Sequence, residues 1–164
     1  MSYRNKTYVI FDGDKDMWAY AYMLGWKKNE HMDFDFYNAH DVNIITNISS
    51  EENTKRKLRE RLGSTKQAIV AVGESTKNLY RFVRWELDVC LEKDIPIVVT
   101  NLNGKRSMDA ERCPPLLKGK PIVHVAFKAK IIQKALDDFC DNHQKYKDKT
   151  DLYYNDSVYT SLGL

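Results

Sequence analysis

Residues 68–100 read AIVAVGESTKNLYRFVRWELDVCLEKDIPIVVT, and the spacing of apolar side chains changes twice along them. The runs Gln67–Val72 and Ile95–Thr100 are short and rich in Ile and Val, which is typical of strands covered on both faces of a parallel sheet. Between them, Asn78–Lys93 carries apolar residues at the spacing of one helix face. We interpret the stretch as a strand, a helix and a second parallel strand, joined by a right-handed crossover.

The remaining chain continues this alternation of strands and helices. Further strands are expected at Thr7–Phe11, Phe34–Asn38 and Pro121–Phe127, and further helices after a cap at Asp14 or Asp16, over Ser50–Leu62 and over Ala129–His143. The alternation predicts an α/β protein with a three-layer, flavodoxin-like fold and a five-stranded parallel sheet. The second strand alternates apolar and polar residues, as an edge strand does, which fits the order 2-1-3-4-5. Ligands of such sheets bind beyond the carboxyl ends of the strands where the order reverses, here between the first and third strands.

Length and composition indicate one globular domain. The chain has 164 residues, of which 43% are hydrophobic and 30% are charged, a balance that can bury a core. We expect the domain to span residues 1–144. Residues 145–164 are rich in Tyr, Asp and Lys without a clear period, and we expect a C-terminal tail that packs on the domain or on a partner.

Several classes of function lack their signatures. The net charge of +3 is too small to require nucleic acid as a partner. The absence of G-x-G-x-x-G, P-loop and G-x-S-x-G motifs argues against a Rossmann dinucleotide fold, a P-loop NTPase and an α/β-hydrolase. The sequence has no signal-peptide pattern and no run of about 18 apolar residues, so we expect a cytoplasmic protein without a membrane partner. Three distant cysteines, Cys90, Cys113 and Cys140, are expected to be free thiols.

Glu86 is the most informative single residue. On a helical wheel it falls in the middle of the apolar arc that contains Val83 and Leu87. Burial of an unpaired carboxylate is costly, so this side chain needs a partner, an opening to a cleft or a chemical use. Backbone donors, Arg81 or Arg84 could satisfy it, and a role in chemistry is the other interpretation. The pattern alone leaves both open.

Three acidic residues, Asp12, Asp14 and Asp16, follow the first strand in the sequence FDGDKDMW. An Asp-x-Asp pair at the carboxyl end of a strand could hold Mg²⁺, as in haloacid-dehalogenase-type phosphatases. Those enzymes also need a second acidic pair after a later strand, whereas the pair Asp137–Asp138 lies within an expected helix. We therefore favour helix capping as the role of the three acids and predict no metal site.

Two further patterns are interpreted as structural. Trp18, Tyr22 and Trp26 recur at the spacing of one helix face, and we expect them to pack in the core. His124 lies inside the strand run PIVHVAF, where we expect its ring to be satisfied by neighbouring groups.

The central stretch also carries motifs that resemble a known family. They are a Gly-x-Ser-Thr turn after the third strand (Gly73–Thr76), the helical run Phe-Val-Arg-Trp-Glu (Phe82–Glu86) and the Lys-Asp-Ile-Pro-Ile-Val-Val entry to the fourth strand (Lys93–Val99). Together they resemble the TIR-like domains of bacterial anti-phage defence, of the Thoeris type and its DUF1863 relatives. The resemblance is best over Lys6 to about Asn101.

The resemblance implies an enzyme that cleaves the nicotinamide–ribose bond of NAD⁺. The product would be ADP-ribose or a cyclic ADP-ribose isomer, an anti-phage signal read by an effector protein. It also implies self-association on activation, with a phage protein as a possible trigger, and NAD⁺ as substrate rather than cofactor. Glu86 would be the catalytic residue. The substrate-binding residues would be Phe11, Asp12, Asp14, Lys15, Asn38 and Phe82.

The sequence departs from the family at Asp12-Gly13-Asp14-Lys15, where many TIR domains carry a serine or an aromatic residue followed by basic residues. Two acids beside a pyrophosphate are unfavourable unless they bind ribose hydroxyls or the cationic nicotinamide ring. Two other functions stay open. One is a non-catalytic module for self-association or nucleotide sensing. The other is a nucleoside 2-deoxyribosyltransferase-like enzyme, whose Met-Glu-Leu-Gly run is replaced here by Trp85-Glu86-Leu87-Asp88.

Overall fold

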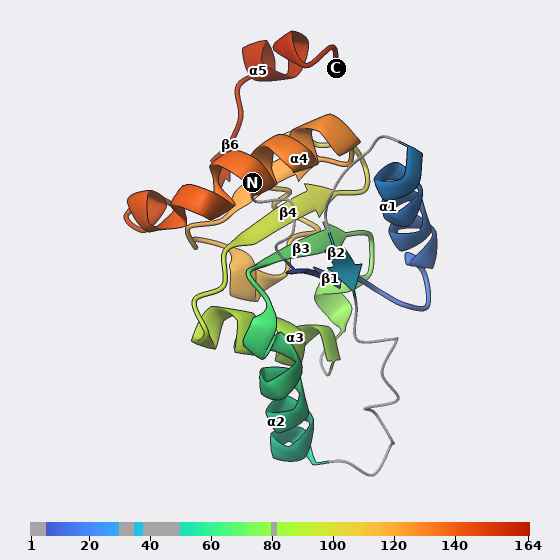
Figure 1. The fold of residues 1–164 in the computed structure, drawn as a ribbon, viewed down its shortest axis with the longest axis vertical. Coiled ribbons are helices and arrows are strands. Elements are labelled where there is room, and N and C mark those ends of the chain that lie inside the picture. The colour runs from blue at the N-terminus through green and yellow to red at the C-terminus, as the bar shows by residue number, and fades with distance from the viewer. Residues whose placement is uncertain (1–5, 30–34, 38–49, 80–81) are drawn as a thin grey trace.

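The computed structural model describes residues 6–29, 35–37, 50–79 and 82–164. Within these ranges the strands form one sheet in which every pairing is parallel. They are β1 (Lys6–Ile10), β2 (Asp35–Tyr37), β3 (Gln67–Val72), β4 (Ile97–Asn101), β5 (Val123–Ala126) and β6 (Leu152–Tyr153). Their order is β2-β1-β3-β4-β5-β6, which contains the series 2-1-3-4-5 with one strand added at its end. The predicted α/β fold class is confirmed (Figure 1).

Helices cover both faces of the sheet. The α-helices are α1 (Met17–Asn29), α2 (Glu51–Arg61), α3 (Phe82–Glu92), α4 (Ala129–Asp138) and α5 (Asp156–Ser161). Figure 1 shows α2 and α3 on one side of the sheet and α4 on the other. Side chains of α2 and α3 pack in one core cluster with the sheet, and those of α1, α4 and α5 pack in a second cluster. We call these two sides the α2/α3 face and the α1/α4 face.

Strand β1 sends successive side chains to opposite faces, as the pleat of a strand requires. Tyr8 and Ile10 lie in the cluster of the α2/α3 face, whereas Val9 and Phe11 lie in the cluster of the α1/α4 face. All four side chains are buried. A side chain that points from α3 toward the sheet is therefore on the same side as Tyr8 and Ile10.

The helix bounds agree with expectation at α2 and differ at α3 and α4. Ser50 caps α2, and its hydroxyl accepts a hydrogen bond from the backbone N–H of Asn53 at 3.2 Å. The described part of α3 begins at Phe82, and Thr76–Asn78 forms a separate 3₁₀ turn instead of the expected first turn of this helix. Helix α4 ends at Asp138 and is followed by the 3₁₀ helix Cys140–Tyr146.

Residues 145–164 contribute both a strand and a helix. Strand β6 extends the sheet by pairing with β5, so the sheet has six strands in the described ranges rather than the five expected. Tyr159 of α5 is fully buried in the cluster of the α1/α4 face, and its hydroxyl accepts a hydrogen bond from the backbone N–H of Ala126 at 3.0 Å. A strand of two residues carries too few side chains to show a period, which is why the sequence did not predict it.

The aromatic stripe of α1 is more exposed than expected. Trp18 is 46% and Tyr22 60% exposed, so the expectation of core packing is wrong for these two side chains. Trp26 packs on the core through Phe127, with ring centroids 4.8 Å apart. The buried positions of α1 are Ala19, Tyr20 and Met23. Neither α1 nor any other helix in the described part of the chain is long and apolar enough to cross a membrane.

Candidate active site

Glu86 projects from the second turn of α3 into the core between this helix and the sheet. Its side chain is 6% exposed, and its neighbours Val83, Leu87 and Cys90 are buried as well, which confirms that Glu86 lies on the buried side of the helix. The hydroxyl of Tyr8 on β1 donates a hydrogen bond to Glu86 Oε1 at 3.1 Å. Tyr8 itself is fully buried.

Tyr8 is a partner of Glu86 that the sequence did not suggest. Arg84 is exposed and lines a cavity of about 300 Å³ beside α3, together with Lys77 and the segment 114–116, and Glu86 is not part of that lining. Arg81 lies outside the described residues. Among the residues that the structure describes, none donates a hydrogen bond to Glu86 Oε2. One carboxylate oxygen is therefore held by Tyr8, and the other is left for a different donor.

Burial dominates the electrostatics of this pair. It raises the pKa of Glu86 from 4.5 to about 8, and the hydrogen bond from Tyr8 opposes the rise because it favours the ionised carboxylate. Burial, followed by the charge of Glu86, also raises the pKa of Tyr8, so this hydroxyl keeps its proton and stays a donor. The pKa of the Cys90 thiol is raised by burial and by Glu86. The pKa of Glu86 thus lies closer to neutral pH than that of an ordinary, exposed glutamate.

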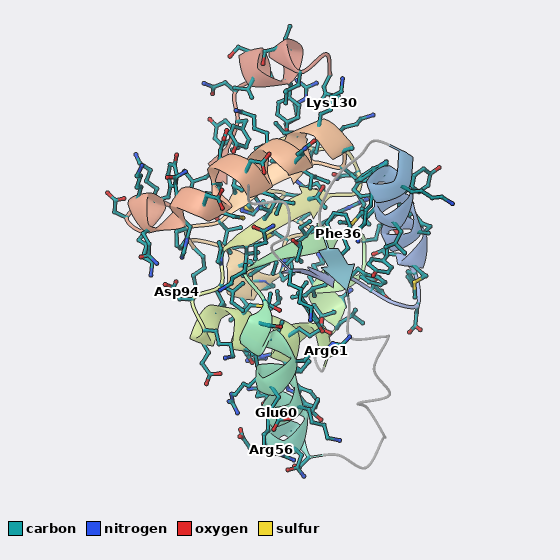
Figure 2. All side chains as sticks on the ribbon, viewed as in Figure 1. Phe36, Arg56, Glu60, Arg61, Asp94 and Lys130 are labelled. Atoms are coloured by element: carbon teal, nitrogen blue, oxygen red, sulfur yellow. The ribbon has the colours of Figure 1, made fainter. Side chains whose placement is uncertain are left out.

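Arg61 is the charged residue that approaches the pair from α2. Its positive charge lowers the pKa of Tyr8 and so acts against the effect of burial. Figure 2 shows Arg61 at the end of α2 near the sheet, with Arg56 and Glu60 farther out along the helix. Arg56 and Glu60 form an exposed ion pair with each other at 3.4 Å.

A second group of polar residues lies at the carboxyl edge of the sheet, between β1 and β3. Asp12 is 3% exposed, and its Oδ1 accepts hydrogen bonds from the backbone N–H groups of Asp14 and Lys15 at 3.0 and 3.3 Å. Its Oδ2 accepts a hydrogen bond from the Ser75 hydroxyl at 2.6 Å. Asp12 therefore ties the loop after β1 to the loop after β3, at the place where open α/β sheets bind ligands.

Asp16, the third of the acids that follow β1, is buried at the start of α1. It is 7% exposed, and burial, followed by the charges of Asp12 and Glu74, raises its pKa. Its carboxylate lies against Gly73 so closely that a Cβ at this glycine would lie 2.3 Å from Asp16 Oδ2. The sequence signal is a glycine directly after a strand, which often marks a close approach of the backbone to another group.

The structure brings together only some of the expected site residues. Phe11 stacks on Tyr20 with ring centroids 5.3 Å apart, on the α1/α4 face, so its side chain and that of Glu86 lie on opposite sides of the sheet. Asp14 and Lys15 are exposed in the loop after β1. Phe82 is the first residue of α3, and Asn38 lies outside the described residues.

The described residues hold no group of three or more His, Cys, Asp or Glu side chains arranged to bind a metal ion. Asp12 is instead saturated by two backbone N–H groups and a hydroxyl. Cys90, Cys113 and Cys140 are all buried free thiols, as expected.

One comparison with known proteins bears on this site. The family model of the Thoeris protein ThsB, TIR-like domain, matches residues 8–107. The matched segment covers more than half of the chain, begins at Tyr8 and includes Glu86 and both loops at the carboxyl edge. The chain therefore belongs to the family of Thoeris ThsB TIR-like domains.

Proposed function

We propose that this Thoeris TIR-like protein cleaves the bond between nicotinamide and ribose in NAD⁺, with Glu86 as the catalytic carboxylate. The observation that carries the proposal is the burial of Glu86, a carboxylate between α3 and the sheet with one oxygen held by Tyr8. A buried carboxylate with a strongly shifted pKa is a frequent mark of a catalytic group. Family membership supports the same residue, because the matched segment contains it.

The reaction needs only one carboxylate. When the bond between C1′ of the ribose and the ring nitrogen breaks, both electrons stay on nicotinamide, which leaves as a neutral molecule without a general acid. Positive charge develops on the ribose, as in glycoside hydrolysis. Ionised Glu86 stabilises this charge and accepts hydrogen bonds from ribose hydroxyls through Oε2. Attack of water at C1′, with loss of a proton, gives ADP-ribose, and attack by another group of the same nucleotide gives a cyclic isomer.

The raised pKa of Glu86 fits a substrate that carries positive charge. With a pKa of about 8, the carboxyl is mostly protonated in the empty site at neutral pH. A nicotinamide ring with its positive charge close to the carboxyl favours the ionised form and lowers this pKa. Substrate binding would thus generate the carboxylate where it is needed.

The loop after β1 supplies the remaining polar groups of the proposed site. Asp14 and Lys15 are exposed there, so Lys15 would contact a phosphate and Asp14 a ribose hydroxyl. Asp12 ties this loop to the loop after β3 through Ser75 and stays a proposed substrate contact from the resemblance to the family. The backbone of Phe11 would lie at the floor of the pocket, and Asn38 and Phe82 remain as proposed contacts from the resemblance to the family.

We also propose that the protein self-associates through α1. Within the described ranges, four of the five large hydrophobic side chains that are exposed lie on this helix. They are Met17, Trp18, Tyr22 and Leu24. Contiguous exposed apolar surface of this kind marks interaction sites.

A second copy of the chain fits this surface. Helix α1 has no charged residue from Met17 to Trp26, but Lys27 and Lys28 lie in its last turn and exposed Asp14 lies just before it. Two such helices packed antiparallel bring the lysines of each close to Asp14 of the other, a self-complementary arrangement. In the cell, the nucleotide product would act as the signal to an effector protein, with a phage protein as the trigger and cytoplasmic NAD⁺ as the substrate.

The experiment that tests the function is nicotinamide release from NAD⁺, measured by chromatography for wild type and Glu86→Gln. It is run at high protein concentration and in lysate of phage-infected cells, so that an assembled state is sampled. Glu92→Gln, an exposed glutamate on the same helix, is the matched control. Release by wild type and Glu92→Gln but not by Glu86→Gln supports the proposal. Self-association without release in either setting would favour a non-catalytic module, and base exchange on deoxynucleosides would favour a deoxyribosyltransferase.

A further inference from the structure

We infer that Tyr8 is a positioning residue of this site: its hydroxyl holds Glu86 Oε1 and thereby presents Oε2 to the substrate. The inference rests on the proposed function, in which Glu86 is the catalytic carboxylate. It adds a second residue, 78 positions away in the chain, through which the first one acts.

The geometry of the pair supports a fixed orientation. Tyr8 is fully buried in the cluster of the α2/α3 face, where Val83 and Leu87 of α3 also lie, so its ring cannot swing away. The Tyr8 hydroxyl is the one group in the described part of the chain that donates to Glu86, at 3.1 Å. A carboxylate held through one oxygen by a rigid donor loses little freedom when a substrate hydroxyl binds the other oxygen.

Packing alone does not require the hydroxyl group of Tyr8. Ile10, the next buried side chain of β1 on the same face, is apolar, and a phenylalanine would fill the space of the Tyr8 ring. A hydroxyl buried in an apolar cluster costs free energy unless it is hydrogen-bonded, and here its acceptor is Glu86. The two polar groups are thus buried together, and each satisfies part of the hydrogen-bonding capacity of the other.

Tyr8 also acts on the pKa of Glu86, against the larger effect of burial. The groups that act electrostatically on the pair are Cys90 on α3 and Arg61 at the end of α2. Across the helix interface, Lys55 of α2 and Asp88 of α3 pair with each other at 3.2 Å. The Tyr8 hydrogen bond opposes the effect of burial on Glu86, since a donor favours the ionised acceptor. Loss of the hydroxyl would therefore make the carboxylate harder to form.

The first test compares the pH dependence of kcat/KM for nicotinamide release in wild type, Tyr8→Phe and Tyr159→Phe. Tyr159→Phe is the matched control, because it also removes a hydrogen-bonded hydroxyl from a fully buried tyrosine, but on the α1/α4 face. For Tyr8→Phe we expect the acid limb of the pH profile of kcat/KM to move up by about one pH unit. The activity at pH 7 should then fall about tenfold and recover toward that of wild type at high pH. The limb of Tyr159→Phe should stay in place.

A second variant gives a shift in the opposite direction. Incorporation of 3-fluorotyrosine at position 8 keeps the ring and makes the hydroxyl a stronger donor, so the acid limb should move to lower pH. A role in packing alone moves neither limb. An unchanged limb in both Tyr8→Phe and the fluorinated protein would overturn the inference.

A third measurement separates this inference from the proposed function. The free energy of unfolding against pH, for wild type minus Glu86→Gln, reports the titration of Glu86 in the folded protein without any turnover. On a Tyr8→Phe background this titration should move to higher pH. If Glu86→Gln keeps full activity, the proposed function fails whatever Tyr8 does. If Glu86→Gln is inactive but Tyr8→Phe changes neither the limb nor the titration, only the role of Tyr8 fails.

Discussion

The Tyr8 hydroxyl on β1 donates a hydrogen bond to Glu86 Oε1 on α3 at 3.1 Å, in the interior of the protein. This contact joins the first strand of the sheet to the helix that follows the third strand. It keeps a carboxylate in a place where burial disfavours charge. A group held in this way costs stability, and that cost can be measured.

Glu86→Gln should stabilise the protein at alkaline pH. The pKa of Glu86 is raised from 4.5 to about 8 by burial, so its contribution to stability is fully present below pH 4.5 and is lost as pH rises toward 8. The uncharged glutamine has no such loss. We expect the free energy of unfolding of the variant relative to that of wild type, measured with urea, to be higher at pH 9 than at pH 5, by on the order of a few kcal/mol. Equal slopes against pH in both proteins would contradict a buried, proton-holding Glu86.

His124 should make the fold sensitive to acid. Its ring is fully buried in β5, and neither ring nitrogen has a hydrogen-bond partner among the described residues, so the expectation that neighbouring groups satisfy it is wrong. Burial lowers the pKa of His124 from 6.5 to about 4. The stability that comes from the neutral ring is present above pH 6.5 and is lost as pH falls toward 4, because the unfolded chain takes up the proton first. His124→Leu should flatten the stability curve between pH 6.5 and 4.

The charge of Asp151 modulates this effect. Asp151 Oδ1 lies 3.8 Å from His124 Nε2, and its charge raises the pKa of the imidazole against the effect of burial. Asp151→Asn removes the charge with little change of shape, so acid should destabilise this variant more steeply than wild type. A curve identical to that of wild type would show that the two residues are not coupled.

Gly73→Ala should destabilise the loop that follows β3. The new Cβ would lie 2.3 Å from Asp16 Oδ2, so either the carboxylate or the backbone must shift, at a cost of about 1–3 kcal/mol. Gly25→Ala is the matched control, because a Cβ there meets nothing within 4 Å and alanine favours the helix by about 0.5–1 kcal/mol. Thermal unfolding should show opposite signs for the two variants. A Gly73→Ala protein as stable as wild type would rule out the close approach of Asp16.

Self-association through α1 predicts a difference between two exposed tyrosines. Tyr22 on α1 and Tyr153 on β6 are each 60% exposed. Tyr22→Glu places a charge in the middle of the apolar surface of α1 and should abolish concentration-dependent association in sedimentation velocity. Tyr153→Glu should associate as wild type does. Loss of association in both variants, or in neither, would exclude α1 as the contact surface.

Much of the site could be predicted from the sequence where the evidence was local. The 3.6-residue period placed Glu86 on the buried side of α3, and the alternation of strands and helices gave the order of the first five strands. Helical periodicity needs only neighbouring residues, so such predictions do not depend on the rest of the fold. The capping of α2 by Ser50 could be predicted from the same kind of local evidence.

The features that could not be predicted depend on tertiary contacts. Arg81 and Arg84 are near Glu86 in the chain, whereas the partner found, Tyr8, comes from a strand 78 residues away. Phe11 directly follows β1, but the pleat turns its side chain to the opposite face from Glu86. Periodicity also cannot tell whether an apolar helix face meets the core or the surface, and α1 exposes Trp18 and Tyr22.

The central claim is that Glu86 cleaves NAD⁺, and the most direct test is the rate of nicotinamide release at saturating NAD⁺ for Glu86→Gln against wild type. Glu92→Gln, the same substitution at an exposed position of the same helix, serves as the control. We predict that Glu86→Gln folds and loses about 10²-fold or more of the rate, the scale of losing one electrostatic stabiliser of a transition state, while Glu92→Gln keeps the rate of wild type. A folded Glu86→Gln protein that releases nicotinamide as fast as wild type would contradict the claim.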